Sequence, residues 1–159
     1  MLKRSFCCIV ACLLTIALGA VSPAETMIRK ANIVEIDGTA EVRTPGSEKW
    51  VMAEVGMSLT QGDIIKTADG SIVVLLLEGV SGTANVELQA KSELQMAELF
   101  EDQEDNSQQT LLDLSIGRLL ITSKKLRSEK SKFQVKTPTS IIGVRGTTFS
   151  VSVETEKVE

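Results

Sequence analysis

The stretch KTPTSIIGVRGTTFSV, residues 136–151, decides the fold class of this chain. It consists mainly of threonine, glycine and aliphatic residues. Pro138 restricts Thr137 to extended geometry and cannot donate a hydrogen bond within a sheet, so it is expected to end one strand. Gly143 and Gly146 permit backbone angles that are closed to other residues. A second strand should follow, with alternate residues entering the core to seal the sheet: Thr147, Phe149 and Val151.

The same period of two recurs along the rest of the chain. Residues 34–43 alternate apolar and polar side chains, which predicts a half-buried strand with a bend at Gly38 and one apolar face made by Val34, Ile36, Ala40 and Val42. The six aliphatic residues 72–77 predict a strand covered on both faces. Residues 92–99 alone leave a helix open, although the alternation around them favours a strand.

Turn signals separate about ten such strands. A Gly-Asp turn at 62–63 precedes a β-branched strand, and the polar residues 101–109 are typical of a long hairpin tip. Two strands are expected on either side of Gly117, and residues 124–132 read as a basic connection. The predicted fold is a single all-β domain, an antiparallel, twisted, β-helix-like sandwich or roll, behind a signal-peptide helix.

The first 24 residues have the pattern of a secretory signal peptide. Lys3 and Arg4 precede an apolar run at residues 6–20, and small residues and Pro23 follow. The run is shorter than the ~20 residues of a membrane-spanning helix, which favours cleavage over an anchor. Cleavage after Ala24 or after Ala20 is expected. The domain plan is then a signal peptide at 1–24, a linker at 25–32, a β-domain at 33–153 and a tail at 154–159.

The amino-acid composition argues against several classes of function. All three cysteines precede the expected cleavage sites, so the mature chain has neither disulfides nor thiolates. There is no histidine and no tyrosine, which removes the commonest general base and the commonest metal ligand. Without Lys3 and Arg4, fifteen basic residues face twenty-one acidic ones, a net charge of −6 that disfavours nucleic-acid binding. No enzyme activity, cofactor or metal is expected.

With these elements placed, the chain resembles the FecR domain family over residues 33–153. Trp50 is followed by Gly62-Asp63-x-Ile65-x-Thr67 and later by Gly117. The closing part reads Phe133-x-Val135-x-Thr137-Pro138, then Ile142-Gly143-Val144-x-Gly146-Thr147-x-Phe149-x-Val151. The residues that carry the motif, which we expect to be mainly structural, are Trp50, Gly62, Asp63, Thr67, Gly117, Phe133, Thr137, Pro138, Gly143, Gly146, Thr147 and Phe149.

The resemblance implies an exported, periplasmic or extracellular all-β domain. The founding members of the family are regulators in iron-citrate signalling, with a cytoplasmic segment, a membrane helix and a periplasmic region. Only a few residues precede the apolar run here, and no further domain is expected after residue 153. The role of a sigma regulator is therefore not carried over, and contact with the membrane is expected only through the signal peptide.

Several polar groups are candidates for function, each with a structural alternative. Asp63 could bind a cation, but such an aspartate more often fixes its own turn. The acidic residues 101–105 could bind Ca²⁺ but lack the spacing of a calcium loop. A basic segment could meet a partner, anionic lipid or the acidic loop of the same chain. Arg145 could bind an acidic group or form an internal ion pair. The candidate partner surface comprises Lys124, Lys125, Arg127 and Arg145.

Three functions remain open from the sequence. The first is a non-catalytic sensory or adaptor module that binds an envelope protein. The second is a structural component that associates with itself through strand edges. The third is a domain that captures a small ligand such as a metal chelate or a glycan, for which the four mature aromatic residues offer few platforms.

Overall fold

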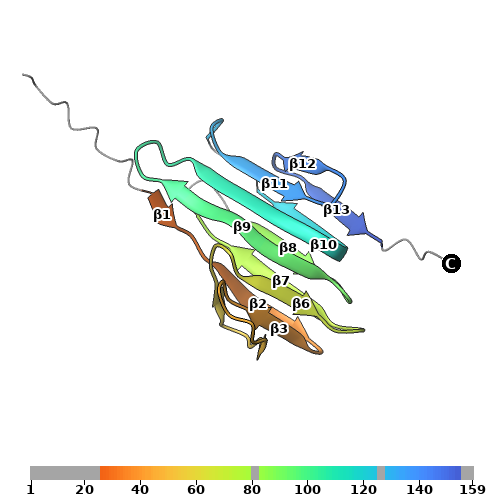
Figure 1. Ribbon diagram of the computed structural model, residues 1–159. Helices are drawn as coiled ribbons and strands as arrows, with labels where there is room; N and C mark the ends of the chain where they lie inside the picture. Colours follow the sequence, from red (N-terminus) through yellow and green to blue (C-terminus); the bar gives the residue numbers. More distant parts are fainter. Residues whose placement is uncertain (1–25, 80–82, 125–127, 155–159) are drawn as a thin grey trace, which may run out of the picture.

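The computed structural model describes residues 26–79, 83–124 and 128–154, and these form one all-β domain (Figure 1). The all-β, single-domain prediction is therefore confirmed. No helix in this part of the chain is long and apolar enough to cross a membrane. The strands are β1 (Thr26–Ile28), β2 (Ala31–Asp37), β3 (Ala40–Arg43), β4 (Val51–Met52), β5 (Ser58–Leu59), β6 (Ile64–Thr67), β7 (Ile72–Leu77), β8 (Ala84–Leu88), β9 (Glu93–Asp102), β10 (Gln108–Ser123), β11 (Lys132–Lys136), β12 (Ile141–Val144) and β13 (Thr148–Val153).

The strands form one curled, mostly antiparallel sheet. Its central order is β4-β3-β6-β9-β10-β8-β7-β2-β5. Beside this path, β1 pairs with β9, β11 pairs in parallel with β10, β12 pairs with β11, and β13 pairs with β10. The sheet therefore folds over its own core, with the C-terminal strands along one margin (Figure 1).

Strand β10 holds the two halves of the sheet together. Its first part, up to Ile116, pairs with β9 and β11, and its second part, from Gly117, pairs with β8 and β13. Gly117 has a φ of +101°, and a Cβ there would overlap the side chain of Ser92. The two strands expected around Gly117 are thus one strand, and this glycine is the corner at which it changes neighbours.

The core lies between the two halves and is almost entirely aliphatic. In β8, β9 and β10, alternate residues such as Val86, Leu94, Leu112 and Ile121 are fully buried. Phe133 is the one aromatic side chain among the buried residues that the structure describes. Burying each such side chain contributes about 2 kcal/mol, so the alternation read from the sequence is what drives the sheet to close. The helix left open for residues 92–99 is replaced by β9.

A bulge corrects the face predicted for the first strand. Ala40 and Val42 are buried as expected, but Val34 is 44% exposed and Ile33 is buried in its place. The register of β2 against β7 shifts between Ile33 and Glu35, so Val34 is the extra residue. One inserted residue turns the side chains before it to the opposite face, which is why strict alternation gave the wrong side for Val34.

The aliphatic run of β7 is covered on one face only. Val73, Leu75 and Leu77 are fully buried, whereas Val74 and Leu76 are half-buried and Ile72 is exposed. The prediction that both faces are covered was wrong, because in the described part of the chain no second layer packs over the outer face as it would in a parallel sheet. The run therefore reflects β propensity as well as burial.

The closing stretch forms strands as predicted, but two residues differ in role. Val151 is buried and Phe149 and Val153 pack against the core, whereas Thr147 is exposed and lies before β13. Gly146 has a φ of +70°, as a glycine turn requires. Gly143 is not in the left-handed region, and a Cβ there would meet nothing within 4 Å, so its conformation does not require glycine.

The boundaries of two predicted loops also change. Residues 26–32, expected as a linker, contain β1 and the start of β2. The hairpin tip expected at 101–109 is shortened, because β9 continues to Asp102 and β10 begins at Gln108. The expected signal peptide and most of the C-terminal tail lie outside the described residues.

Candidate functional site

The Gly-Asp turn of the family motif fixes the backbone. Asp63 is buried, and its Oδ2 accepts hydrogen bonds from Thr60 N (2.6 Å) and Thr60 Oγ1 (3.0 Å). Gly62 has a φ of +92°, and a Cβ there would lie 2.5 Å from Pro45 Cγ. Oδ1 of Asp63 has no hydrogen-bond partner in the described part of the chain. These contacts match the turn-fixing alternative for Asp63.

Thr67, the next residue of the motif, joins two turns. Its Oγ1 donates to the carbonyl of Gln89 (2.5 Å) and accepts from the backbone N–H of Ser92 (3.0 Å). Thr67 and Ser92 are both buried, so these bonds replace the water that the polar groups lose on folding. Thr67 therefore has a structural role beside the Gly117 corner.

The ring of Trp50 contacts two cations of the neighbouring strands β3 and β6. The guanidinium of Arg43 is 4.8 Å and the ammonium of Lys66 is 4.1 Å from the ring centroid. Lys66 also pairs with Glu41 at 2.8 Å. Contacts of this kind stabilise by roughly 0.5–1 kcal/mol at exposed sites, so Trp50 anchors the chain just before β4.

The motif residues around β11 lie partly in the core and partly in the turn that follows this strand. Thr137 is buried; its backbone N–H donates to the Ser140 carbonyl (2.8 Å), and its Oγ1 accepts from Ser140 N (3.0 Å). Pro138 follows directly, after the end of β11. Phe133 faces the core from β11. The structure thus places this part of the motif at a hairpin and in the interior.

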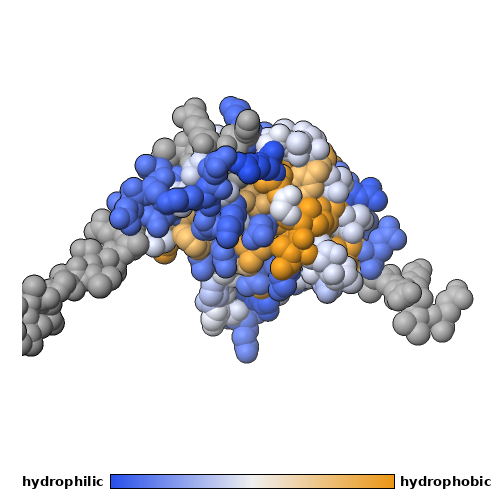
Figure 2. Space-filling view, turned by 90° about the horizontal axis from the view of Figure 1, so that it is seen from above, coloured by the Kyte–Doolittle hydropathy of each residue, from blue (hydrophilic) through white to orange (hydrophobic). Residues whose placement is uncertain are grey.

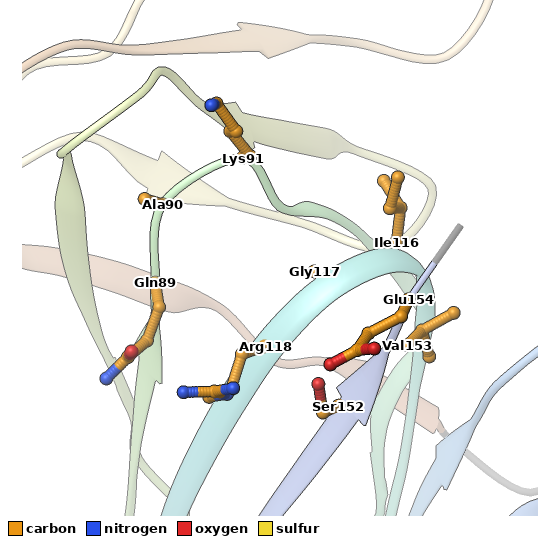
Figure 3. Close-up of a pocket in the computed structure, with 9 residues that line it drawn as sticks. All are labelled: Gln89, Ala90, Lys91, Ile116, Gly117, Arg118, Ser152, Val153 and Glu154. Atoms are coloured by element: carbon orange, nitrogen blue, oxygen red, sulfur yellow. The ribbon is translucent and has the colours of Figure 1, made fainter. Parts of the chain in front are cut away.

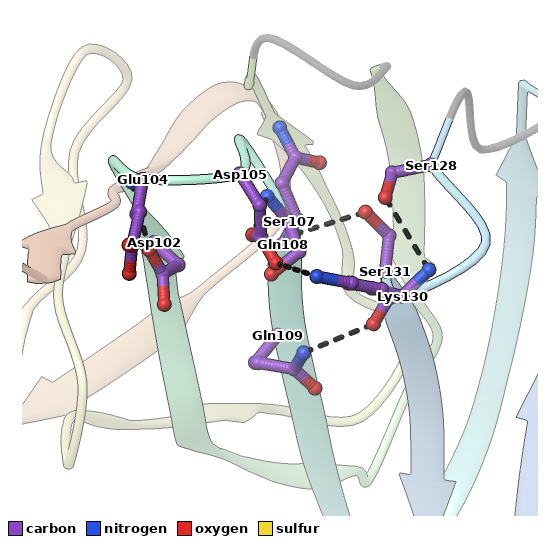
Figure 4. Close-up of polar contacts among 9 residues, drawn as sticks. All are labelled: Asp102, Glu104, Asp105, Ser107, Gln108, Gln109, Ser128, Lys130 and Ser131. Atoms are coloured by element: carbon purple, nitrogen blue, oxygen red, sulfur yellow. Dashed lines mark hydrogen bonds and ion pairs between the residues drawn. The ribbon is translucent and has the colours of Figure 1, made fainter. Parts of the chain in front are cut away.

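The acidic hairpin tip faces part of the basic segment, as the internal alternative predicted (Figure 4). Lys130 Nζ lies 2.8 Å from Asp105 Oδ2. The hydrogen bond from Lys130, with further ones from Ser107, lowers the pKa of Asp105 to about 2. The same contact raises the pKa of Lys130. In the described residues no group of three acidic side chains is arranged to hold a metal ion.

Two members of the predicted partner surface, Lys124 and Arg145, lie in the described part of the chain. Lys124 is exposed, and its backbone N–H donates to the carbonyl of Thr83 at 3.2 Å. Lys125 and Arg127 lie outside the described residues. Arg145 forms the predicted internal ion pair, with its Nη2 3.6 Å from Glu129 Oε1. The two side chains are 63% and 94% exposed, so this pair contributes little stability.

A buried polar cluster around Arg29 was missed by sequence reasoning. The guanidinium donates to the Glu78 carbonyl from Nε (3.1 Å) and Nη2 (3.0 Å), and from Nη1 to Thr110 Oγ1 (2.9 Å). Gln108 donates to Glu101 Oε2 at 3.1 Å beside it. Burial lowers the pKa of Arg29, and the charge of Glu101 opposes that effect. The partners are 49 and 81 residues away, so no local pattern could reveal the cluster.

An open hollow lies at the corner of the sheet (Figure 3). It has a volume of about 420 Å³ and adjoins a second hollow of about 410 Å³, with which it shares Ile116, Ser152, Val153 and Glu154. Arg118 of β10 and Lys91, which pairs with Asp69 at 2.8 Å, supply positive charge. Glu154 is the one carboxylate in the lining. The hollow is a surface depression rather than an enclosed site.

Apolar side chains at the margins of the sheet are the second feature that sequence reasoning missed. Figure 2 shows an apolar patch on the side where β12 and β13 lie in Figure 1. In β12, Ile141 is 63% and Ile142 is 36% exposed. At the opposite margin Val51, Met52 and Val55 are each more than half exposed. Apolar side chains left in water at a sheet margin are typical of contact surfaces.

The described part of the chain is therefore an all-β domain with unpaired strand edges and exposed apolar side chains at the margins of its sheet. A family model described as FecR protein matches residues 63–159, more than half of the chain, so the chain belongs to the FecR family. Trp50 and Gly62 precede the matched residues. The comparisons with curated proteins and with solved structures gave no match.

Proposed function

We propose that this chain is a non-catalytic, exported FecR-family module that binds a protein partner in the bacterial envelope as a sensor or adaptor. The observation that carries the proposal is the exposure of large apolar side chains on the sheet margins. Val51 is 58%, Val55 62% and Ile141 63% exposed. Covering such side chains contributes about 25 cal/mol per Å² of apolar area, which favours association with another chain.

The arrangement of the polar groups favours a binding role over a catalytic role. Asp63 fixes a turn, Asp105 pairs with Lys130, and Asp113 pairs with Lys136 at 2.7 Å. A general base needs a poised, accessible group near a substrate pocket, whereas these carboxylates are already engaged. The proposal therefore assigns no catalytic residue, cofactor or metal to the chain.

Export is the second part of the proposal. It rests on the apolar run at residues 6–20 behind Lys3 and Arg4, and on membership of a family associated with the cell envelope. The expected cleavage would place β1 within a few residues of the new N-terminus. N-terminal sequencing of the protein recovered from the periplasm tests this part, with residue 21 or residue 25 as the expected first residue.

Self-association is the alternative that a specific observation favours. β12 and β13 each pair with a single strand in the described sheet, so each leaves one edge unpaired. Unpaired edges can add a strand from a second copy. In this alternative the protein is a structural component of the envelope instead of an adaptor.

Affinity purification distinguishes the two functions. The tagged mature protein is cross-linked in cells, purified from envelope extracts and analysed by quantitative mass spectrometry, with a Val51→Glu, Ile141→Glu double variant as the control. One partner recovered in stoichiometric amount, and reduced in the control, supports the adaptor. Recovery of the chain alone as a defined oligomer supports the structural role, and recovery of the monomer alone contradicts both.

A further inference from the structure

Strand β12 has an unpaired edge at the margin of the sheet. Residues 141–144 pair with 133–136 of β11, and no strand in the described part of the chain pairs with the other side of β12. In an antiparallel strand, every second residue directs its N–H and C=O to each side. The outer edge of β12 therefore presents backbone donors and acceptors to solvent.

This edge lacks the usual protection against strand addition. Its sequence Ile-Ile-Gly-Val contains no lysine and no proline, and its pairing with β11 has no bulge. The other margins differ: β1, β4 and β5 have at most three residues, and β13 exposes Thr148, Ser150 and Ser152. β12 combines an apolar surface with a free edge long enough to pair.

Positive charge gathers at one end of the edge. Lys132 and Arg145 directly flank the paired residues Phe133 and Val144, so the two cations lie next to each other across the hairpin. Like charges placed opposite each other destabilise a sheet. Glu129 approaches Arg145 only to 3.6 Å and is 94% exposed. A hollow of about 330 Å³ lies between these side chains and could admit an acidic group.

We propose that β12 is a strand-addition site for an extended segment of a partner protein in which apolar and acidic side chains alternate. Backbone hydrogen bonds to the edge provide affinity. Successive residues of a strand point to opposite faces, so Ile141 shares the outer face with Lys132 and Arg145, and Ile142 shares the inner face with the buried Val144. The acidic side chains of the segment meet Lys132 and Arg145 on the outer face, and its apolar side chains pack beside Ile142 on the inner face. The inference rests on the proposed protein-binding function and names the chemistry of the partner.

A synthetic peptide tests the site directly. The probe is a fluorescein-labelled, N-acetylated peptide TVEVEVT, and its control is TVKVKVT. Fluorescence anisotropy is measured at low salt with the mature protein and with the variants Ile141→Glu and Val34→Glu. Val34→Glu places the same charge on an exposed apolar residue of β2, a strand that pairs with neither β11 nor β12. Circular dichroism confirms that each variant is folded.

The acidic peptide is expected to bind the parent protein saturably. Its affinity for Ile141→Glu, and the affinity of the lysine peptide for the parent protein, should each be lower by about tenfold or more, equal to about 1.4 kcal/mol. Val34→Glu should bind as the parent does. Absence of saturable binding, equal binding of both peptides, or equal loss in both variants overturns the site. A dimer detected by ultracentrifugation and lost in Ile141→Glu also overturns it, because a second copy then occupies the edge. The envelope purification still decides the proposed function separately.

Discussion

Gly117 is the residue on which the two-part pairing of β10 depends. Substituting alanine introduces a left-handed residue with a Cβ and a clash with Ser92. Together the strain and the clash should cost about 3 kcal/mol. Urea denaturation of Gly117→Ala measures this loss. Gly46→Ala, with a φ of +76° and no neighbour within 4 Å, should lose only about 1 kcal/mol, and Gly143→Ala almost nothing. Equal losses in all three variants would contradict the corner role of Gly117.

Arg29 is predicted to hold the N-terminal segment to the sheet. Arg29→Ala leaves the Glu78 carbonyl and the Thr110 hydroxyl without their buried donor, which should cost about 2–3 kcal/mol in the free energy of unfolding. Lys30→Ala, one residue away and exposed, is the matched control and should change stability by less than about 0.5 kcal/mol. Hydrogen exchange in Arg29→Ala should also accelerate at the backbone amide of residue 29, which donates to the Leu99 carbonyl in the parent protein.

Asp105 gives the prediction that depends on pH. Its pKa is about 2 in the folded protein and about 3.8 in the unfolded chain, so the pair with Lys130 stabilises the fold above pH 4. That stabilisation is lost as the pH falls from about 4 to 2. Carbon-detected NMR titration should give a carboxyl pKa near 2, which returns toward the ordinary value in Lys130→Gln. A pKa that does not change in this variant would show that the pair does not form.

At the scale of the elements, the sequence predicted which segments form strands better than how those strands are joined. Period-two alternation identified residues 40–43, 133–136 and 148–153, because it follows directly from burial of one face. It gave Val34 the wrong face, because a bulge depends on the opposing strand. The continuity of β10 through Gly117 was likewise set by pairing with strands distant in sequence.

The same limit applies to the candidate site. The turn expected at Gly62 and Asp63 is present, because a Gly-Asp turn is a local structure. Thr67, expected in the strand that follows, is the last residue of β6. The Arg29 cluster and the free edge of β12 were missed, because both depend on which strands end up as neighbours. Arg145 shows the intermediate case: the sequence offered an internal ion pair as an alternative, but its partner Glu129 could not be chosen among the acidic residues.

The final strand is predicted to seal the core through one side chain. Val151 is 6% exposed and pairs opposite Leu119 of β10. Val151→Asp places a charge in the aliphatic core and should lower stability by about 3 kcal/mol or more. Ser152→Asp places the same charge on the exposed face of β13 and should have little effect. Thermal unfolding followed by circular dichroism at pH 7 compares the two, and equal melting temperatures would contradict the closing role of β13.

At the scale of the whole molecule, the residues that stabilise the fold are different from the residues that are exposed for association. The aliphatic core and the turns fixed by glycine, Asp63 and Thr67 hold the curled sheet together. The exposed apolar residues lie at its margins, where substitution should alter association and leave the core intact. This separation is what a binding module requires, since its surface can change without loss of the fold.

Photo-cross-linking in living cells tests the central claim most directly. A photoreactive phenylalanine analogue replaces Ile141 at the β12 edge or, as a control, the exposed Asp37 at the end of β2. One dominant adduct with an envelope protein is expected from position 141, and none is expected from position 37. Adducts that are equal at both positions, or absent from position 141, would contradict binding through this margin of the sheet.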